Sequence, residues 1–276
     1  MPPPGAVPKS RLAEMGRLAD GAFCPVEAAL VLAAMDRPDA RIEAYHGYLD
    51  ELAAEVRVEA GLALAADAAI ALAEVIGRRH RYRGDERDDD EDTDSSLMDL
   101  IDSRRGPHGM VGLLTLAVAR RAGFAAEALA FPIRFLIRLE CGGERLIVDP
   151  ARPDRVVGAP EMRALLKAAN GLAAELEPGH YAAMGNRDVL LRLRTEAKLR
   201  LLRTGEVAAA LKVVETMLLF APDAAMLWRE AGLMHMRLDN PHGAVAALEQ
   251  FVARTPNAQA RARTLALLAE LKGHLH

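Results

Sequence analysis

The sequence predicts an α+β protein in which a mainly helical part with a small antiparallel sheet precedes an all-α array. Alanine and leucine supply much of the apolar half of the chain, and aromatic residues only 4%, a composition that favours helices. Two strand-like runs follow each other closely, FPIRFLIRL at Phe131–Leu139 and RLIVDP at Arg145–Pro150. Beyond Asn186, the prolines at positions 222 and 256 stand 34 residues apart, which indicates a repeat.

Length and charge limit the classes of function. The 276 residues suffice for one large domain or two ordinary ones with a sizeable core. A net charge of −4 gives no basis for nucleic acid or an anionic membrane as a partner. No window of about 18 apolar residues is free of charge, and the N-terminal MPPPGAVPKSR lacks the apolar core of a signal peptide. We therefore expect a cytoplasmic protein that contacts no membrane.

The chain offers few residues for a metal or a cofactor. Cys24 and Cys141 lie far apart and match no metal-ligand spacing, so a disulfide framework is not expected. Residues 84–94, GDERDDDEDTD, carry eight acids, and clustered carboxylates suit hard cations. Their spacing does not fit an EF-hand, so we interpret the stretch as a solvated acidic loop. Neither a phosphate-binding glycine loop nor a Gly-x-Ser-x-Gly elbow is present. We expect neither cofactor nor metal.

The part before the strand-like runs predicts several helices. PVEAALVLAAMDRPD has Pro25 in its first turn and ends before Pro38. The next run is amphipathic, with an apolar stripe at three- and four-residue spacing formed by Tyr45, Leu49, Leu52 and Val56. SSLMDLIDSRRG predicts a short helix with a serine N-cap and a glycine stop, and a further helix is expected at Met110–Ala122.

The strand-like runs predict a β-hairpin with a tight turn at Gly142-Gly143. That turn pairs Cys141 with Glu144 and sets Glu140 against Arg145, an opposite-charge pair. The same register places six apolar residues on one face of the hairpin: Ile133, Phe135, Ile137, Leu139, Leu146 and Val148.

Arg134 and Asp149 share the opposite face of this hairpin as diagonal neighbours, about 7–8 Å apart at the backbone. A long side chain spans that distance. We therefore expect a salt bridge between the two, in which the guanidinium binds the carboxylate through two N–H donors.

The C-terminal part resembles tetratricopeptide repeats, which have a period of about 34 residues. One unit carries the large anchor, the close-packing glycine, the small contact residue and the closing proline at Trp228, Gly232, Ala244 and Pro256. Shifted back by one period, the preceding unit keeps Ala210 and Pro222 but has Arg194 and Lys198 in place of the tryptophan and glycine. We expect one regular repeat, one degenerate repeat and a final helix at Ala258–Lys272 that caps the stack.

Taken together, these features resemble the bacterial SirB-type transglutaminase-like proteins, in which such a domain precedes tetratricopeptide repeats. The segments that carry the resemblance are SSLMDLIDSRRG, VARRAGF, FPIRFLIR and IVDP. The resemblance implies a papain-like superfamily core of helices packed on a small antiparallel sheet. The expected organisation is a flexible tail at 1–24, a transglutaminase-like domain at 25–180 that includes the acidic loop, and the repeat region at 186–276.

The resemblance also implies where a catalytic triad would lie. Catalytic members of the wider superfamily have a cysteine at the start of the core helix, a histidine on one strand and an aspartate on the next; the SirB-type branch commonly has serine near the nucleophile position. Here these positions are Met110, Arg134 and Asp149, so only the aspartate is retained. Methionine is not a useful nucleophile, and a permanently protonated arginine is not a general base.

No other residue of the sequence is expected to replace the missing groups. His108 lies two positions before Met110, but its proline–glycine context indicates a loop histidine. Cys141 lies at the hairpin tip, far along the strand from Arg134, and Cys24 is interpreted as a small packing residue. We therefore expect no catalytic residues.

The function expected from the sequence is that of a non-catalytic scaffold or regulator that binds a protein or peptide through its repeats. The first repeat's first helix carries four basic residues, which make an acidic peptide one expected ligand unless they only form a solvated face: Arg192, Arg194, Lys198 and Arg200. Two alternatives remain open. One is an amide hydrolase or acyl transferase of the transglutaminase-like class with an atypical nucleophile; the other is a structural role in which the array only buttresses the first domain.

Overall fold

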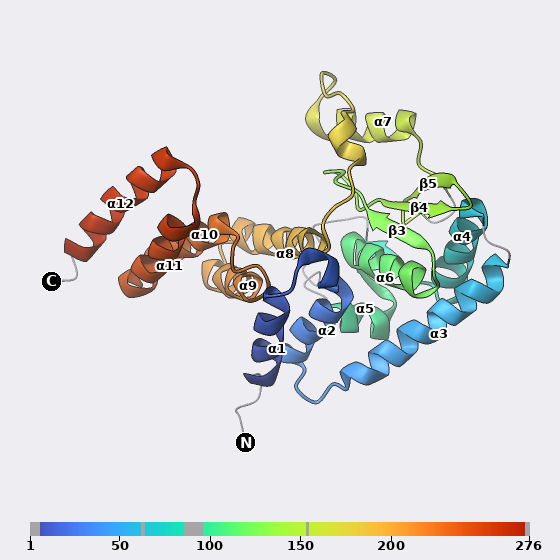
Figure 1. Cartoon of the computed structure of the whole chain (residues 1–276), viewed down its shortest axis with the longest axis horizontal. Helices are drawn as coiled ribbons and strands as arrows, with labels where there is room; N and C mark the ends of the chain where they lie inside the picture. The colour runs from blue at the N-terminus through green and yellow to red at the C-terminus, as the bar shows by residue number, and fades with distance from the viewer. Residues whose placement is uncertain (1–5, 62–63, 86–95, 153–154, 274–276) are drawn as a thin grey trace. The chain divides into compact units, whose positions relative to one another are not determined.

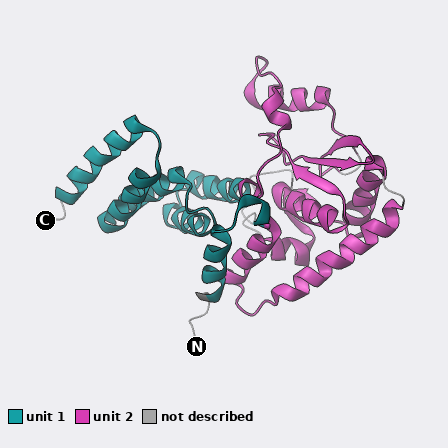
Figure 2. Ribbon diagram, in the orientation of Figure 1, with its two compact units in different colours: residues 1–23, 190–276 teal, residues 24–189 magenta. Residues whose placement is uncertain are grey.

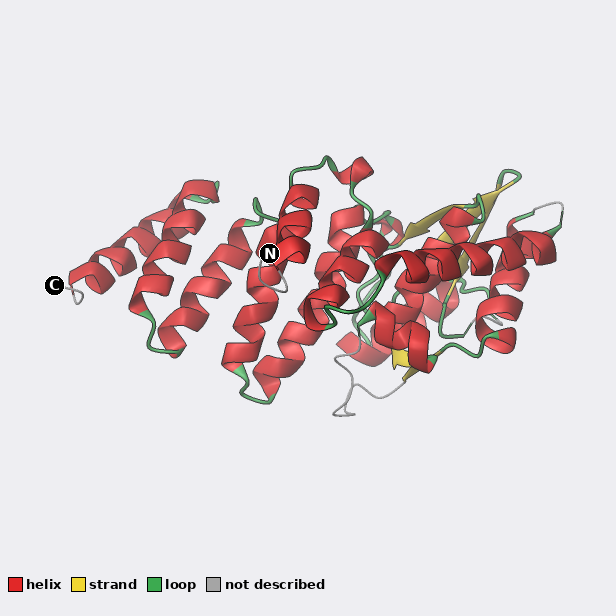
Figure 3. Ribbon diagram, turned by 90° about the horizontal axis from the view of Figure 1, so that it is seen from below, coloured by secondary structure: helices red, strands yellow, loops and turns green. Residues whose placement is uncertain are grey.

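The computed structural model describes residues 6–61, 64–85, 96–152 and 155–273. The chain forms two compact units, one of residues 24–189 and the other of residues 1–23 together with 190–276 (Figure 2). All described strands belong to the unit of residues 24–189 (Figure 3). Residues 86–94 of the expected acidic loop lie outside the described residues, while Gly84 and Asp85 belong to a short strand.

The unit of residues 24–189 combines helices with short strands (Figure 1). Its helices are α2 (Pro25–Asp36), α3 (Ile42–Ala60), α4 (Ala65–Leu72), α5 (Leu97–Ser103), α6 (His108–Arg121) and α7 (Ala159–Asn170). A π-helical segment (Ala73–Arg79) continues α4, and a 3-10 turn (Pro178–Tyr181) follows α7. Its strands are β1 (Arg83–Asp85), β2 (Arg105–Pro107), β3 (Ala125–Ala128), β4 (Ile137–Cys141) and β5 (Glu144–Val148).

Two small sheets form the β part of this unit. Strands β1 and β2 pair in parallel, and β3, β4 and β5 form an antiparallel sheet in that order. The predicted hairpin register is confirmed, because Cys141 pairs with Glu144 and Glu140 with Arg145. Gly142 adopts a φ of 59° and the next residue, also glycine, one of 82°, which a side chain would strain. Helices α4 and α6 pack against the antiparallel sheet.

The strand prediction was wrong in two places. Strand β4 begins only at Ile137, so residues 131–136 do not form the predicted strand. Phe135, in that segment, instead packs so tightly on α6 that a Cβ at Gly112 would lie 2.3 Å from its ring. Strand β3 was not predicted because three of its four residues are alanine, which has little preference for strands.

The helix predictions hold for most of this unit. Helix α2 has Pro25 in its first turn and ends at Asp36 as expected, and three members of the predicted α3 stripe are fully buried: Leu49, Leu52 and Val56. Ser96 caps α5 and accepts a hydrogen bond from the backbone of Asp99. The expected glycine stop was wrong. Arg104 ends the helix at a φ of 66°, and its guanidinium lies 4.8 Å from the centroids of two tyrosine rings, which compensates for the unusual backbone.

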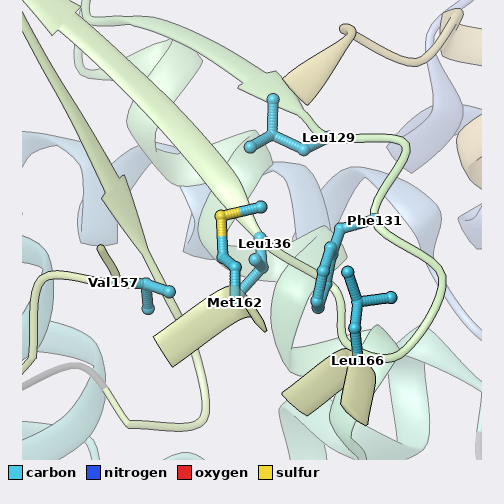
Figure 4. Close-up of a cluster of buried hydrophobic side chains, with 6 residues drawn as sticks. All are labelled: Leu129, Phe131, Leu136, Val157, Met162 and Leu166. Atoms are coloured by element: carbon cyan, nitrogen blue, oxygen red, sulfur yellow. The ribbon is translucent and has the colours of Figure 1, made fainter. Parts of the chain in front are cut away.

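A buried apolar cluster holds the segment between β3 and β4 in place. Figure 4 shows side chains of that segment together with Val157 and two residues of α7; the six are Leu129, Phe131, Leu136, Val157, Met162 and Leu166. All six are nearly inaccessible to solvent. Phe131 and Leu136 therefore anchor the chain on either side of Arg134.

The second unit is helical and has the architecture of a tetratricopeptide array. Its helices are α1 (Ala6–Gly16), α8 (Asn186–Arg203, from Leu190 onward), α9 (Val207–Phe220), α10 (Ala225–Arg237), α11 (Pro241–Arg254) and α12 (Ala258–Gly273). Gly232 fulfils the expected close-packing role, because a Cβ there would lie 2.6 Å from Leu248 of α11. Trp228 on α10 is half-buried; its Nε1 donates a 2.8 Å hydrogen bond to the carbonyl of Pro222, and Arg254 lies over its ring.

The N-terminal residues differ from the expected flexible tail. Helix α1 packs against α9, and the approach is so close that a Cβ at Gly16 would lie 2.2 Å from the carbonyl oxygen of Leu219. Phe23 stacks at 5.9 Å on Phe220, the last residue of α9. The leading prolines suggested a disordered start, but Leu12 is fully buried and gives this segment an apolar contact.

The Gly112–Phe135 contact generates a stability prediction. Gly112→Ala should lower the free energy of unfolding by about 1–3 kcal/mol, because the added methyl overpacks the buried ring. Gly47→Ala is the matched control, since a Cβ in this interior position of α3 meets nothing within 4 Å. The control should gain up to about 1 kcal/mol from the better helix propensity of alanine. Urea denaturation of both variants checks this, and equal effects would contradict the packing argument.

Candidate functional site

The candidate site is centred on Asp149, which follows directly after β5. Its side chain is only 3% exposed. The backbone N–H of Ala151 donates to Oδ1 at 3.0 Å, and the N–H of Arg152 donates to the Asp149 carbonyl at 2.9 Å, so a tight turn fixes the carboxylate. A buried carboxylate requires compensating donors, and two side chains supply them.

Arg134 is the first of these donors. It lies in the segment between β3 and β4, and its Nη1 donates to Oδ2 of Asp149 at 2.8 Å. The predicted salt bridge is therefore confirmed. The hydrogen bond joins one guanidinium nitrogen to one carboxylate oxygen, not the two-donor arrangement that we expected.

His108 is the second donor, and the interpretation of it as a loop residue was wrong. It is the first residue of α6, and its Nε2 lies 2.9 Å from Oδ1 of Asp149. Because an ionised carboxylate only accepts, the proton is on Nε2. Sequence reasoning read Pro107 and Gly109 as loop residues, although a proline just before a helical run also marks a helix start.

The environment sets the charge state of Asp149. Burial by itself favours the neutral acid, but the hydrogen bonds and charges of His108 and Arg134, with the N–H of Ala151, outweigh it and lower the pKa of Asp149 below its ordinary value. The carboxylate therefore stays ionised at neutral pH. Both of its oxygens are engaged, Oδ1 by His108 and Ala151 and Oδ2 by Arg134.

A neighbouring glycine brings β1 against this site. A Cβ at Gly84 would lie 3.0 Å from the Cα of His108 and 3.5 Å from the Cβ of Ala151. Met110, which the resemblance to the SirB-type proteins places at the nucleophile position, is in the first turn of α6 and half-buried. The arrangement thus brings Arg134 and Asp149 together and adds His108.

A second polar cluster in this unit surrounds the Arg104 side chain. Its guanidinium donates to the hydroxyl of Tyr82 and to the carbonyl of Ile101, the latter at 2.7 Å. Burial raises the pKa of Tyr82, and its hydrogen bond to the Tyr48 hydroxyl acts in the same direction, so the phenol stays protonated. Tyr48 in turn contacts His80 at 3.0 Å. His80 also contacts the carboxylate of Glu55 at 3.0 Å, so the cluster is a continuous hydrogen-bonded network between α3, the π-helical segment and the end of α5.

The expected partner-binding group in the repeat region is only partly accessible. Lys198 is 4% exposed, and its Nζ donates to Oε2 of Glu230 on α10 at 2.6 Å. The inclusion of Lys198 was therefore wrong, because this cation is already neutralised inside the array. Arg192 pairs with Glu196 one turn further along α8, whereas Arg194 and Arg200 are half-buried.

The described residues provide neither a metal-binding cluster nor a membrane-spanning helix. In the part of the chain that the structure describes, no group of three or more histidine, cysteine or acidic side chains is placed to hold a metal ion. Within those same residues, no helix combines the length and the apolarity needed to cross a bilayer.

Comparison with known proteins identifies the family. A family model described as the transglutaminase-like superfamily matches residues 43–195, more than half of the chain. The chain belongs to the transglutaminase-like superfamily. A model of the tetratricopeptide repeat matches residues 197–269, in line with the helical array. The α+β transglutaminase-like core with C-terminal repeats, expected from the sequence, is confirmed.

Several bacterial proteins are similar to part of this chain. The UPF0162 protein of Vibrio cholerae is 27% identical over 158 residues, which cover 57% of this chain and 58% of that protein. UPF0162 protein YchA of Escherichia coli K12 is 27% identical over 161 residues, 58% of this chain and 60% of the relative. Protein SirB1 of Salmonella typhimurium is 25% identical over 158 residues, 57% and 58% of the two chains. The matches thus span less than two thirds of these relatives, and no solved structure matches.

The lowered pKa of Asp149 predicts how stability depends on pH. Because the folded-state pKa lies below the unfolded value of about 3.9, the ionised carboxylate adds stability above about pH 4, and this contribution is lost as the pH falls through the folded-state pKa. Asp149→Asn should therefore flatten the acid limb of a plot of unfolding free energy against pH. Asp50→Asn, a change at an exposed carboxylate, is the control that should keep the slope. Parallel acid limbs for wild type and Asp149→Asn would contradict this.

Removing Arg134 should destabilise the protein. Arg134→Ala leaves the buried carboxylate with His108 as its remaining side-chain donor, so we expect a loss of about 2–3 kcal/mol, less than the about 3–5 kcal/mol of a fully stranded buried charge. Arg145→Ala breaks the exposed Arg145–Glu140 pair and should leave the unfolding midpoint nearly unchanged. Chemical denaturation distinguishes the two. A loss for Arg134→Ala no larger than for Arg145→Ala would mean that the buried pair contributes no more to stability than the exposed pair.

Proposed function

We propose that this protein is a non-catalytic transglutaminase-like scaffold or regulator, which binds a protein or peptide partner through residues 186–276. In this proposal, residues 25–180 form the transglutaminase-like domain, the protein is cytoplasmic, and it needs no cofactor or metal and contacts neither nucleic acid nor membrane. The match of the repeat model to residues 197–269 supports the binding role, because stacked helical repeats present extended surfaces suited to polypeptides.

The observation that carries the non-catalytic part is the salt bridge between Arg134 and Asp149. The family position of the general base is occupied by a group that keeps its proton at any physiological pH. The carboxylate that would orient a base instead neutralises this fixed charge. Met110, at the nucleophile position, has no proton to give up and no useful attacking atom.

An amide hydrolase or acyl transferase with an atypical nucleophile is the second candidate, and the His108–Asp149 contact favours it. A carboxylate bound to one nitrogen of an imidazole orients the ring and stabilises its protonated form, which is the relation found in nucleophile–base–acid arrangements. His108 enters from the helix and not from the strand of the family triad. To act as a base, His108 would need a neighbouring nucleophile, and no hydrogen bond among the described residues joins it to a serine, threonine or cysteine side chain.

Amide turnover separates these two candidates. Purified wild type should release no ammonia from glutaminyl peptides and incorporate no amine into them above the rate of a heat-unfolded sample. Arg134→His should also remain inactive, because Met110 still cannot attack the carbonyl. Turnover by the wild type that is lost in His108→Ala or Asp149→Asn, with near-ultraviolet circular dichroism unchanged, would establish the hydrolase instead. Loss on alkylation of Cys24 or Cys141 would do the same for a thiol nucleophile.

A further inference from the structure

One face of α10 exposes apolar and cationic side chains in regular order. Met226 is 56% exposed and Leu233 is 37% exposed, and both are large side chains with no need to face water. Arg229 and Arg237 are exposed as well. The four follow one another at spacings of three, four and four residues, which places them on a single face of the helix.

Helix α8 carries a shorter stripe of the same kind. Leu199 is 50% exposed, and Arg203, four residues later, is exposed at the end of the helix. The carboxylate of Glu196 lies one turn before Leu199, but it is paired with Arg192. Among the described residues, none of Arg203, Arg229 and Arg237 forms a salt bridge.

The Lys198–Glu230 bond shows that these two stripes face the same side. Helices α8 and α10 run in the same direction because α9 reverses the chain between them, and the 2.6 Å bond joins their facing surfaces. Each residue turns a helix by about 100°. Leu199 is one step after Lys198, and Arg229 is one step before Glu230. Lys198 points from α8 toward α10, and Glu230 points from α10 toward α8. One residue forward on α8 and one residue back on α10 therefore rotate Leu199 and Arg229 to the same side of the helix pair.

The result is one surface, which we call the arginine–leucine face, formed by Leu199, Arg203, Met226, Arg229, Leu233 and Arg237. It combines three cations, each able to hold a carboxylate through forked N–H donors, with three large apolar side chains. Exposed apolar groups bordered by charges are typical of binding surfaces. The apolar members are aliphatic or thioether groups and include no aromatic ring on which a base could stack, which favours a peptide over single-stranded nucleic acid.

We propose that the arginine–leucine face binds an acidic segment of a partner polypeptide in which leucine-type side chains alternate with carboxylates. This rests on the proposed function and specifies the chemistry of the partner. The carboxylates pair with the three arginines, and the apolar side chains of the segment cover the exposed leucines and methionine. This surface differs from the basic group expected from the sequence, because Lys198 is buried and bound to Glu230 and therefore does not belong to the face.

Fluorescence anisotropy with the full chain tests this. The probe is a labelled 14-residue peptide of glutamate, aspartate and leucine; one comparison peptide has glutamine and asparagine for the acids, and another has serine for leucine. The acidic leucine peptide should bind at least about tenfold more tightly than either comparison peptide, and more weakly as salt is raised. Arg229→Glu and Leu233→Ser should each weaken binding about tenfold or more.

Lys212→Glu is the matched control, since it reverses an exposed charge on α9, a helix that contributes no residue to the face, and should leave affinity unchanged. Equal melting temperatures of all three variants and the wild type exclude unfolding as the cause. No binding of the acidic leucine peptide, equal affinity in Arg229→Glu, or tighter binding of a single-stranded oligonucleotide of equal charge would overturn the proposal. These results leave the non-catalytic function standing, whereas amide turnover would remove that function whatever the peptide does.

Discussion

The transglutaminase-like unit depends on one buried charge. Asp149 brings together three separate segments, namely the end of β5, the start of α6 through His108 and the chain before β4 through Arg134. Taking a carboxylate out of water is costly unless hydrogen-bond donors replace the water, so the loss of either side-chain donor weakens the whole arrangement. The surrounding apolar contacts hold the donors in place, since Phe131 and Leu136, on either side of Arg134, belong to the buried cluster with α7, and Phe135 packs on Gly112.

Arg134 supplies the positive charge that the buried carboxylate of Asp149 needs, but it cannot take up or release a proton. A histidine beside a buried carboxylate can be charged or neutral, and that choice is what a proton-transfer site needs. An arginine beside the same carboxylate has one charge state and therefore fixes the geometry permanently. In the proposed function, the pair therefore holds secondary-structure elements together and transfers no proton. His108 shows how a titratable group can still reach such a carboxylate from a different element.

The sequence predicted most where local rules decide the outcome. The glycine turn determined the hairpin register, and the Arg134–Asp149 pair was predicted correctly although Arg134 lies before β4 and not in the strand that was expected there. It failed where tertiary packing overrides local preference. An alanine-rich segment became β3 only because it pairs with β4, and Lys198, a residue type that usually faces water, is buried because Glu230 receives it. His108 was missed because local context does not reveal which distant carboxylate a helix start will meet.

The pairing of α1 with α9 has a consequence for biosynthesis. A ribosome releases the chain from its N-terminus, so residues 6–16 emerge long before their packing partner at Val207–Phe220 exists. Until then Leu12, which is fully buried in the finished protein, lacks that partner. The unit of residues 24–189 can complete its own core before Val207–Phe220 has been synthesised. The helical unit closes last, and its first helix is a segment that chaperones would meet early in translation.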